Sequence, residues 1–92
     1  MMLTQTANSL AYFSNIVPDV SLSIIGKTFA FFKDESMIEV SIINNAGSTE
    51  ISYVGFESDS VVCEHAAAIV PSDRTAGVIT AIVNDFFTCV SA

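Results

Sequence analysis

The stretch FFKDESMIEVSI, residues 31–42, decides the fold, because apolar residues lie on both sides of a short charged turn. After the turn at residues 33–36, every second residue is apolar: Ile38, Val40 and Ile42. A period of two is typical of a strand with one buried face. The stretch therefore predicts a β-hairpin.

The same period occurs on both sides of this hairpin. Apolar residues alternate with serines in residues 20–24, and we expect Gly26 to form a bulge or corner that divides this long strand. Polar turns at residues 44–48 and 58–59 separate two further strands, over residues 50–57 and 60–65. The expected sheet has four antiparallel strands, or five if the chain breaks at Gly26.

Helical periodicity appears at the two ends of the chain. Residues 3–17 predict a first helix, with Thr4 as N-cap and Pro18 as its end. After Pro71 the period of 3.6 predicts a longer helix, whose apolar stripe is formed by Val78, Ile79, Ile82, Val83, Phe86, Phe87 and Val90.

Two details of the second helix are also predicted. Ser72 or Asp73 is expected to cap its first turn, and Gly77 is expected to allow a close contact between helix and sheet. The fold class is α+β, in the order α-β-β-β-β-α, as a single domain over residues 1–92. Both helices are expected on one face of the sheet.

The second face of that sheet raises a question. Ile43, Val54, Phe56 and Val62 have the opposite parity from apolar neighbours, so both faces carry hydrophobic residues. One interpretation is a surface for a partner or a second copy of the chain. The other is a one-residue shift of register at a bulge, which returns these side chains to the core.

Composition limits the functions that are open to this chain. It has a formal charge of -7 from ten acidic and three basic residues, and 51% of its residues are hydrophobic. Such a chain folds rather than staying disordered, and it repels a phosphate backbone, which excludes nucleic acid as a direct ligand. With no basic, apolar signal sequence and no apolar run of about 18 residues, we expect a soluble, cytoplasmic protein without membrane contact.

Most of the negative charge belongs to the predicted sheet and its turns. Eight acids lie between residues 19 and 64: Asp19, Asp34, Glu35, Glu39, Glu50, Glu57, Asp59 and Glu64. This field favours association with a basic surface. Acids on one strand face repeat about every 6.6 Å, against about 3.4 Å for DNA phosphates, so a few anchoring carboxylates fit better than a copy of DNA.

Catalytic and metal sites have weak support in the sequence. Cys63 and His65 share a strand face, but their side chains do not point at each other as a catalytic nucleophile and base must. Together with Cys89 they could supply three zinc ligands, but they lack the paired spacing of a structural zinc site. Glu57 and Asp59 lack the further oxygen ligands of a calcium loop. We expect no catalytic residues, no metal and no cofactor, with both cysteines as core residues.

In size, acidity and architecture, the chain resembles the small inhibitors of phages and mobile elements, including anti-CRISPR proteins, and it also resembles bacterial immunity proteins. The resemblance implies a non-enzymatic inhibitor that binds a basic protein or nucleoprotein complex, in the host cytoplasm if it is encoded by a phage. We expect the contacts at two turns: Asp34, Glu35, Glu57 and Asp59.

A second interpretation stays open. In charge, the chain is also similar to type III secretion chaperones, which implies an acidic chaperone or adaptor that forms a homodimer or holds a partner segment through the sheet face. An immunity protein that binds a partner segment belongs to the same alternative.

Overall fold

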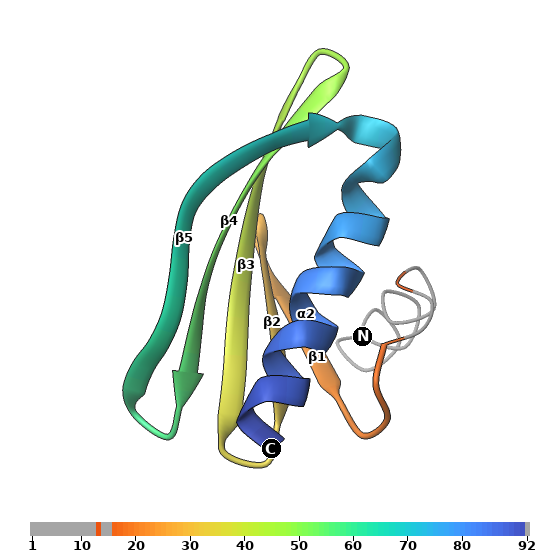
Figure 1. Ribbon diagram of the computed structural model, residues 1–92. Helices are drawn as coiled ribbons and strands as arrows, with labels where there is room; N and C mark the ends of the chain where they lie inside the picture. The colour runs from red at the N-terminus through yellow and green to blue at the C-terminus, as the bar shows by residue number, and fades with distance from the viewer. Residues whose placement is uncertain (1–12, 14–15, 92) are drawn as a thin grey trace.

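Five antiparallel strands follow one another in the same order in the chain and in the sheet. The structure is a computed structural model that describes residue 13 and residues 16–91. Within them the strands are β1 (Ser21–Ile25), β2 (Thr28–Lys33), β3 (Ser36–Asn45), β4 (Ser48–Glu57) and β5 (Ser60–Pro71). A 3-10 turn, η1 (Ser72–Arg74), leads into the helix α2 (Thr75–Ser91), which lies across one face of the sheet (Figure 1).

This arrangement confirms the α+β class, the antiparallel sheet and the C-terminal helix. The predicted first helix, over residues 3–17, falls mostly outside the described residues. The three of its residues that are described, Phe13, Ile16 and Val17, do not lie in a helix.

Gly26 accounts for the fifth strand. Of the two expected forms, a bulge or a corner that divides the long strand, the structure has the corner: with Lys27, Gly26 forms a tight turn that pairs Ile25 with Thr28 across a hairpin. Gly26 has φ 61°, a left-handed conformation that costs glycine little. The β2–β3 and β4–β5 turns use Asp34 (φ 57°) and Ser58 (φ 56°) in the same conformation.

The core forms between α2 and the helix-facing side of the sheet. Phe31, Ile38 and Ile51 are almost fully buried on three neighbouring strands, and Ile79 and Val83 are buried on the facing stripe of α2. The remaining buried hydrophobic residues of the described chain are Phe13, Val20, Leu22, Val40, Phe86 and Phe87. Burial of an aliphatic or aromatic side chain contributes about 1.5–3 kcal/mol, so this contact holds the helix on the sheet.

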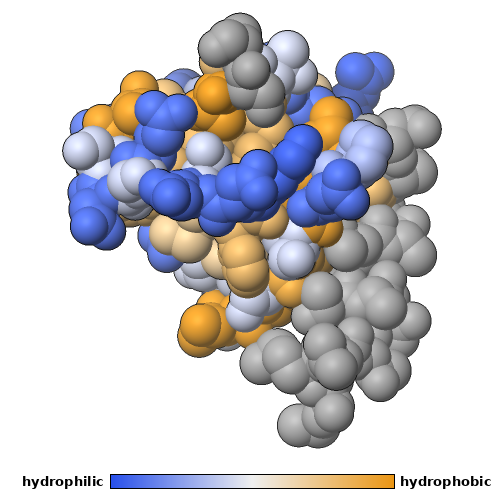
Figure 2. Space-filling model, turned by 90° about the horizontal axis from the view of Figure 1, so that it is seen from below, coloured by the Kyte–Doolittle hydropathy of each residue, from blue (hydrophilic) through white to orange (hydrophobic). Residues whose placement is uncertain are grey.

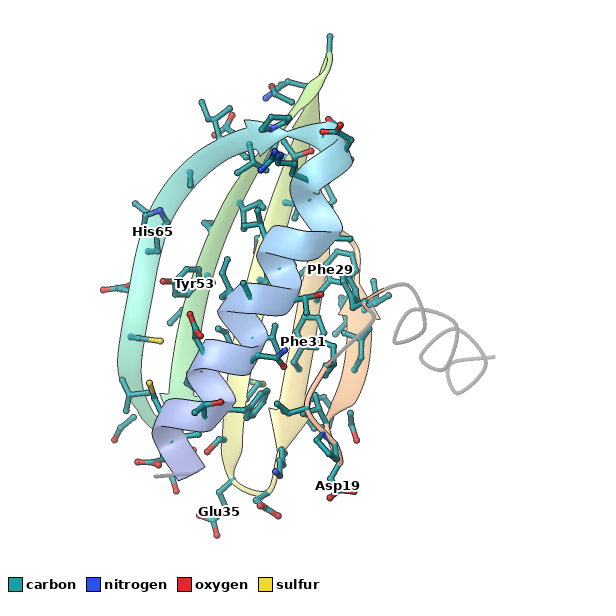
Figure 3. The ribbon with its side chains drawn as sticks, turned by 45° about the vertical axis from the view of Figure 1, so that its right-hand side comes forward. Asp19, Phe29, Phe31, Glu35, Tyr53 and His65 are labelled. Carbon is teal, nitrogen blue, oxygen red and sulfur yellow. The ribbon has the colours of Figure 1, made fainter. Side chains whose placement is uncertain are left out.

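Aromatic rings fill one side of this core. Phe13 makes edge-to-face contacts with Phe29 and Phe31, each with ring centroids 5.5 Å apart. Figure 3 shows Phe29 and Phe31 projecting from the sheet beside α2. The alternation within β2 therefore places Phe29 and Phe31 on the covered face and leaves Phe32 on the other face.

The start of the second helix differs from the prediction. Thr75, not Ser72 or Asp73, begins α2, and η1 has no side-chain cap. The hydroxyl of Ser72 instead lies 3.3 Å from that of Thr49, within hydrogen-bond distance. The 3-10 turn thus ties the end of β5 to β4.

Strand β5 is longer than predicted, since it continues past His65 to Pro71. Alanines at residues 66–68 break the alternation that marks a strand, which explains the short prediction. The register also shifts in two places: between the pairs Tyr53–His65 and Ile51–Ala68, and between Gly55–Cys63 and Phe56–Val61. Each shift adds a residue to β5, which bends this edge strand.

The close helix–sheet contact is made at Gly55, not at Gly77. A Cβ atom at Gly55 would lie 2.5 Å from the ring of Phe86 and 2.7 Å from the sulfur of Cys63. Gly77 is exposed, and a Cβ there would meet nothing within 4 Å. A side chain on β4 at position 55 would therefore push α2 away from the sheet.

We expect Gly55→Ala to lower the free energy of unfolding by about 1–3 kcal/mol, the usual cost of an added methyl group in a filled core. Gly77→Ala is the matched control, and it should raise that free energy by up to about 1 kcal/mol because alanine favours a helix. Urea denaturation of both variants measures the difference. Equal effects would show that Gly55 does not limit the packing.

Candidate functional site

Two of the turns between strands lie side by side at one end of the sheet. The backbone N–H of Ser58 donates a hydrogen bond of 2.8 Å to the carbonyl of Glu35, and the Ser58 hydroxyl donates another of 2.8 Å to the Glu35 carboxylate. The turns meet because β3 pairs with both β2 and β4, so that Ser36 lies between Lys33 and Glu57. The structure thus brings together the two acidic turns that the sequence singled out.

An open hollow of about 630 Å³ lies beside these turns. Asp34, Glu35 and Glu57 line it from the sheet, and Phe87 and Val90 line it from the last turns of α2. The fourth predicted contact, Asp59, does not line the hollow but is exposed next to Ser58 in the β4–β5 turn. Three of the four predicted residues therefore share one concave surface, and the fourth lies at its edge.

Asp19 is a further acid at this end, and the sequence did not predict it as a contact. It directly precedes Val20 and β1, and the pairing of Ser21 with Phe32 brings it level with the end of β2. Figure 3 shows Asp19 and Glu35 at the same end of the molecule. The signal was the break expected at Gly26, but the sequence left open whether it is a bulge or a corner, and only the tight turn sets this register.

We call this group the acidic end: Asp19, Asp34, Glu35, Glu57 and Asp59. Among the described residues, Lys33 is the one lysine or arginine that lies at the acidic end. The helix α2 also ends here without a basic residue in its last turn, so the partial negative charge of its free carbonyl groups adds to the field. Figure 2, which views the molecule from this end, shows a band of hydrophilic side chains with hydrophobic ones on both sides.

The second face of the sheet is not covered by any described element. Ile43 lies on this face and is 52% exposed, and Val54 and Phe56 share it as half-buried side chains. Val62 is exposed where the register of β5 shifts, so it pairs with no residue of β4. Ile43, Val54 and Phe56 therefore lie on the open face rather than in the core, and only Val62 lies at a bulge.

The cysteines and the histidine occupy separate places. Cys63 is half-buried near Phe86, whereas Cys89 is exposed on α2, which corrects the expectation that both thiols are core residues. The ring of His65 stacks on that of Tyr53 with centroids 5.5 Å apart, and Figure 3 labels the two residues on the neighbouring strands β5 and β4. Within residue 13 and residues 16–91, no three His, Cys, Asp or Glu side chains are grouped to hold a metal ion.

Among the described residues, no helix has both the length and the apolar character needed to cross a membrane. No family model, no curated protein and no solved structure matches the chain.

The two thiols are expected to react at different rates. Cys89 should react with a disulfide reagent such as DTNB in the folded protein, because its side chain is exposed. Cys63 should react at least about 10-fold more slowly, since its half-buried side chain is less accessible to the reagent. The variant Cys89→Ser should lose the fast phase and keep the slow one, and a remaining fast phase would show that Cys63 is accessible.

Proposed function

We propose that this chain is a non-enzymatic inhibitor that binds a basic protein, or a basic nucleoprotein complex, and blocks it. The observation that carries this proposal is the meeting of two acidic turns, joined by the hydrogen bonds from Ser58 to Glu35. Those bonds hold carboxylates from two hairpins in one place. A fixed cluster loses less side-chain entropy on binding than the same charges on separate flexible loops.

The distribution of charge supports a basic partner. Half of the ten acids belong to the acidic end, although the described chain is 36 Å long. At physiological salt, charges within about 8 Å reinforce one another, whereas more distant exposed charges are screened. Clustering therefore gives the acidic end a stronger local field than the same acids spread over the surface, and such a field speeds the encounter with a positive surface.

A binding role agrees with the way in which the reactive side chains are used. His65 stacks on Tyr53, and the Cys63 sulfur lies on the side of β5 that faces Phe86. These contacts belong to the packing between strands and helix rather than to the hollow at the acidic end. The proposed site consists of carboxylates and apolar side chains, which suits protein recognition.

The resemblance to phage-encoded inhibitors such as anti-CRISPR proteins fits this proposal, with the host cytoplasm as the place of action. The alternative, an acidic chaperone, adaptor or immunity protein that holds a partner segment, is favoured by one observation. The open face of the sheet carries Ile43 and other exposed hydrophobic residues that no described element covers.

Neutralising the acidic end tests the proposal. In the variant Asp34→Asn/Glu35→Gln/Glu57→Gln/Asp59→Asn, four negative charges are removed, and asparagine at position 34 tolerates the positive φ. The wild-type chain is first used to capture its partner from a lysate of its own source cells. We expect the captured proteins to be basic, and we expect them to bind the variant about 10-fold more weakly. The slope of affinity against salt should also become shallower.

The control is Glu50→Lys/Asp73→Lys, which changes the formal charge of -7 by the same four units but at the opposite end of the sheet, where β4 begins and β5 leads into η1. This variant should bind its partner within about twofold of wild type at a fixed salt concentration. Equal losses in both variants would show that net charge, rather than the acidic end, controls binding. Undiminished binding in the four-site variant would refute the proposal.

A further inference from the structure

Four apolar side chains form a continuous row across the open face of the sheet. The strand register pairs Phe32 with Met37, Met37 with Phe56, and Phe56 with Val61. Each residue comes from a different strand, from β2 to β5. Phe32 is 38% exposed and Val61 is 54% exposed, and the two between them are half-buried. We call this set the apolar row.

The apolar row has carboxylates along both of its long sides. On one side, the row borders the β2–β3 and β4–β5 turns, which carry Asp34 and Asp59. On the other side, the next residues across the open face are Glu39, Val54 and Glu64, which are themselves paired. The negative charges therefore enclose a strip of hydrophobic surface.

No lysine or arginine of the described chain shares that face. Lys33 lies on the helix-facing side beside the hollow, Lys27 lies in the β1–β2 turn, and Arg74 lies in η1. A second copy of this chain is thus a poor occupant, because two such faces would bring like charges together around the same apolar centre. The occupant should carry the opposite charge.

The dimensions of the row indicate the shape of the occupant. Neighbouring strands lie about 4.8 Å apart, so four side chains on four strands span about 14 Å. A helix places one apolar side chain per turn of about 5.4 Å, whereas an extended strand repeats on one face only every 6.6–7 Å or so. A helix of about 10 residues therefore matches the row better than a strand does.

We infer that the apolar row is the docking site for a basic amphipathic helix of the partner protein, with an apolar stripe flanked on both sides by lysine or arginine. This inference deepens the proposed function and rests on it, because the acidic end supplies one of the two flanking lines of charge. The aliphatic stripe covers the row, and the basic residues reach the carboxylates on either side.

A designed peptide tests the inference. The probe is a synthetic helix of about 14 residues, with leucines at i, i+3, i+4 and i+7, lysines elsewhere and one tryptophan in the apolar stripe. The chain itself has no tryptophan, so the emission of the peptide reports binding directly. Two control peptides are the same composition in scrambled order and the same pattern with glutamate in place of lysine.

Matched variants separate the row from the rest of the face. Phe32→Ser/Val61→Ser removes exposed apolar side chains from the row, and we expect binding of the probe to weaken about 10-fold or more. Ile25→Ser/Ile43→Ser removes side chains outside the row that are 74% and 52% exposed, and it should bind within about twofold of wild type. Both control peptides should fail to bind.

Three results would overturn the inference. The wild-type chain could fail to bind the probe, it could bind the probe and the scrambled peptide equally well, or the two serine variants could lose the same amount of affinity for the probe. If the row variant fails to fold, the wild-type amide spectrum decides instead, because the probe should shift residues 32, 37, 56 and 61 but not 25 and 43. A dimer in light scattering that Phe32→Ser/Val61→Ser converts to a monomer would assign the row to a second copy.

The variant with the four neutralised acids keeps the two proposals distinct. If it weakens binding of the probe while the row variant does not, the electrostatic basis of the proposed function stands and the inference fails. If the row variant weakens binding while neutralisation has no effect, the electrostatic basis of the proposed function fails, and the inference that rests on it fails as well.

Discussion

The contact between one helix and one face of the sheet determines the rest of this structure. Ile79 and Val83 on α2 pack with Phe31, Ile38 and Ile51, and this layer contains the buried core of the described chain. A single helix covers a single face. The second face of the sheet therefore depends on its own side chains for solubility, and its mixture of glutamates with exposed hydrophobic residues follows from that constraint.

The sequence predicted the parts of this arrangement that depend on local pattern. Alternation around the polar turns identifies β3 and β4, and the stripe that contains Val83 and Phe86 identifies α2. The two acidic turns lie at the same end of the sheet because the paired antiparallel strands β3 and β4 separate the β2–β3 turn from the β4–β5 turn. The predicted contacts Asp34, Glu35 and Glu57 lie together for this reason.

Other features depend on tertiary packing, and the local sequence gives little sign of them. Gly77 looks like a packing glycine because it interrupts a helix, yet it faces solvent, while Gly55 makes the close contact because Phe86 lies above it. The shifts in β5 could not be read from the run of alanines at residues 66–68, since alanine fits either face. Asp19 was missed because its neighbours depend on the register that Gly26 sets.

Charge and apolar surface are adjacent here for a topological reason. Phe32 and Phe56 each lie within two residues of an acidic turn, so the same hairpins that fix the carboxylates also present the aromatic rings. The two surfaces act at different stages of association. Long-range attraction raises the rate of encounter with a basic partner, whereas desolvation of the apolar side chains slows dissociation once the partner is seated.

Because β3 lies between both turns and also carries Met37, a displacement of this strand would disturb the charges and the apolar row together. The central strand therefore couples the stability of the fold to the geometry of the proposed interface.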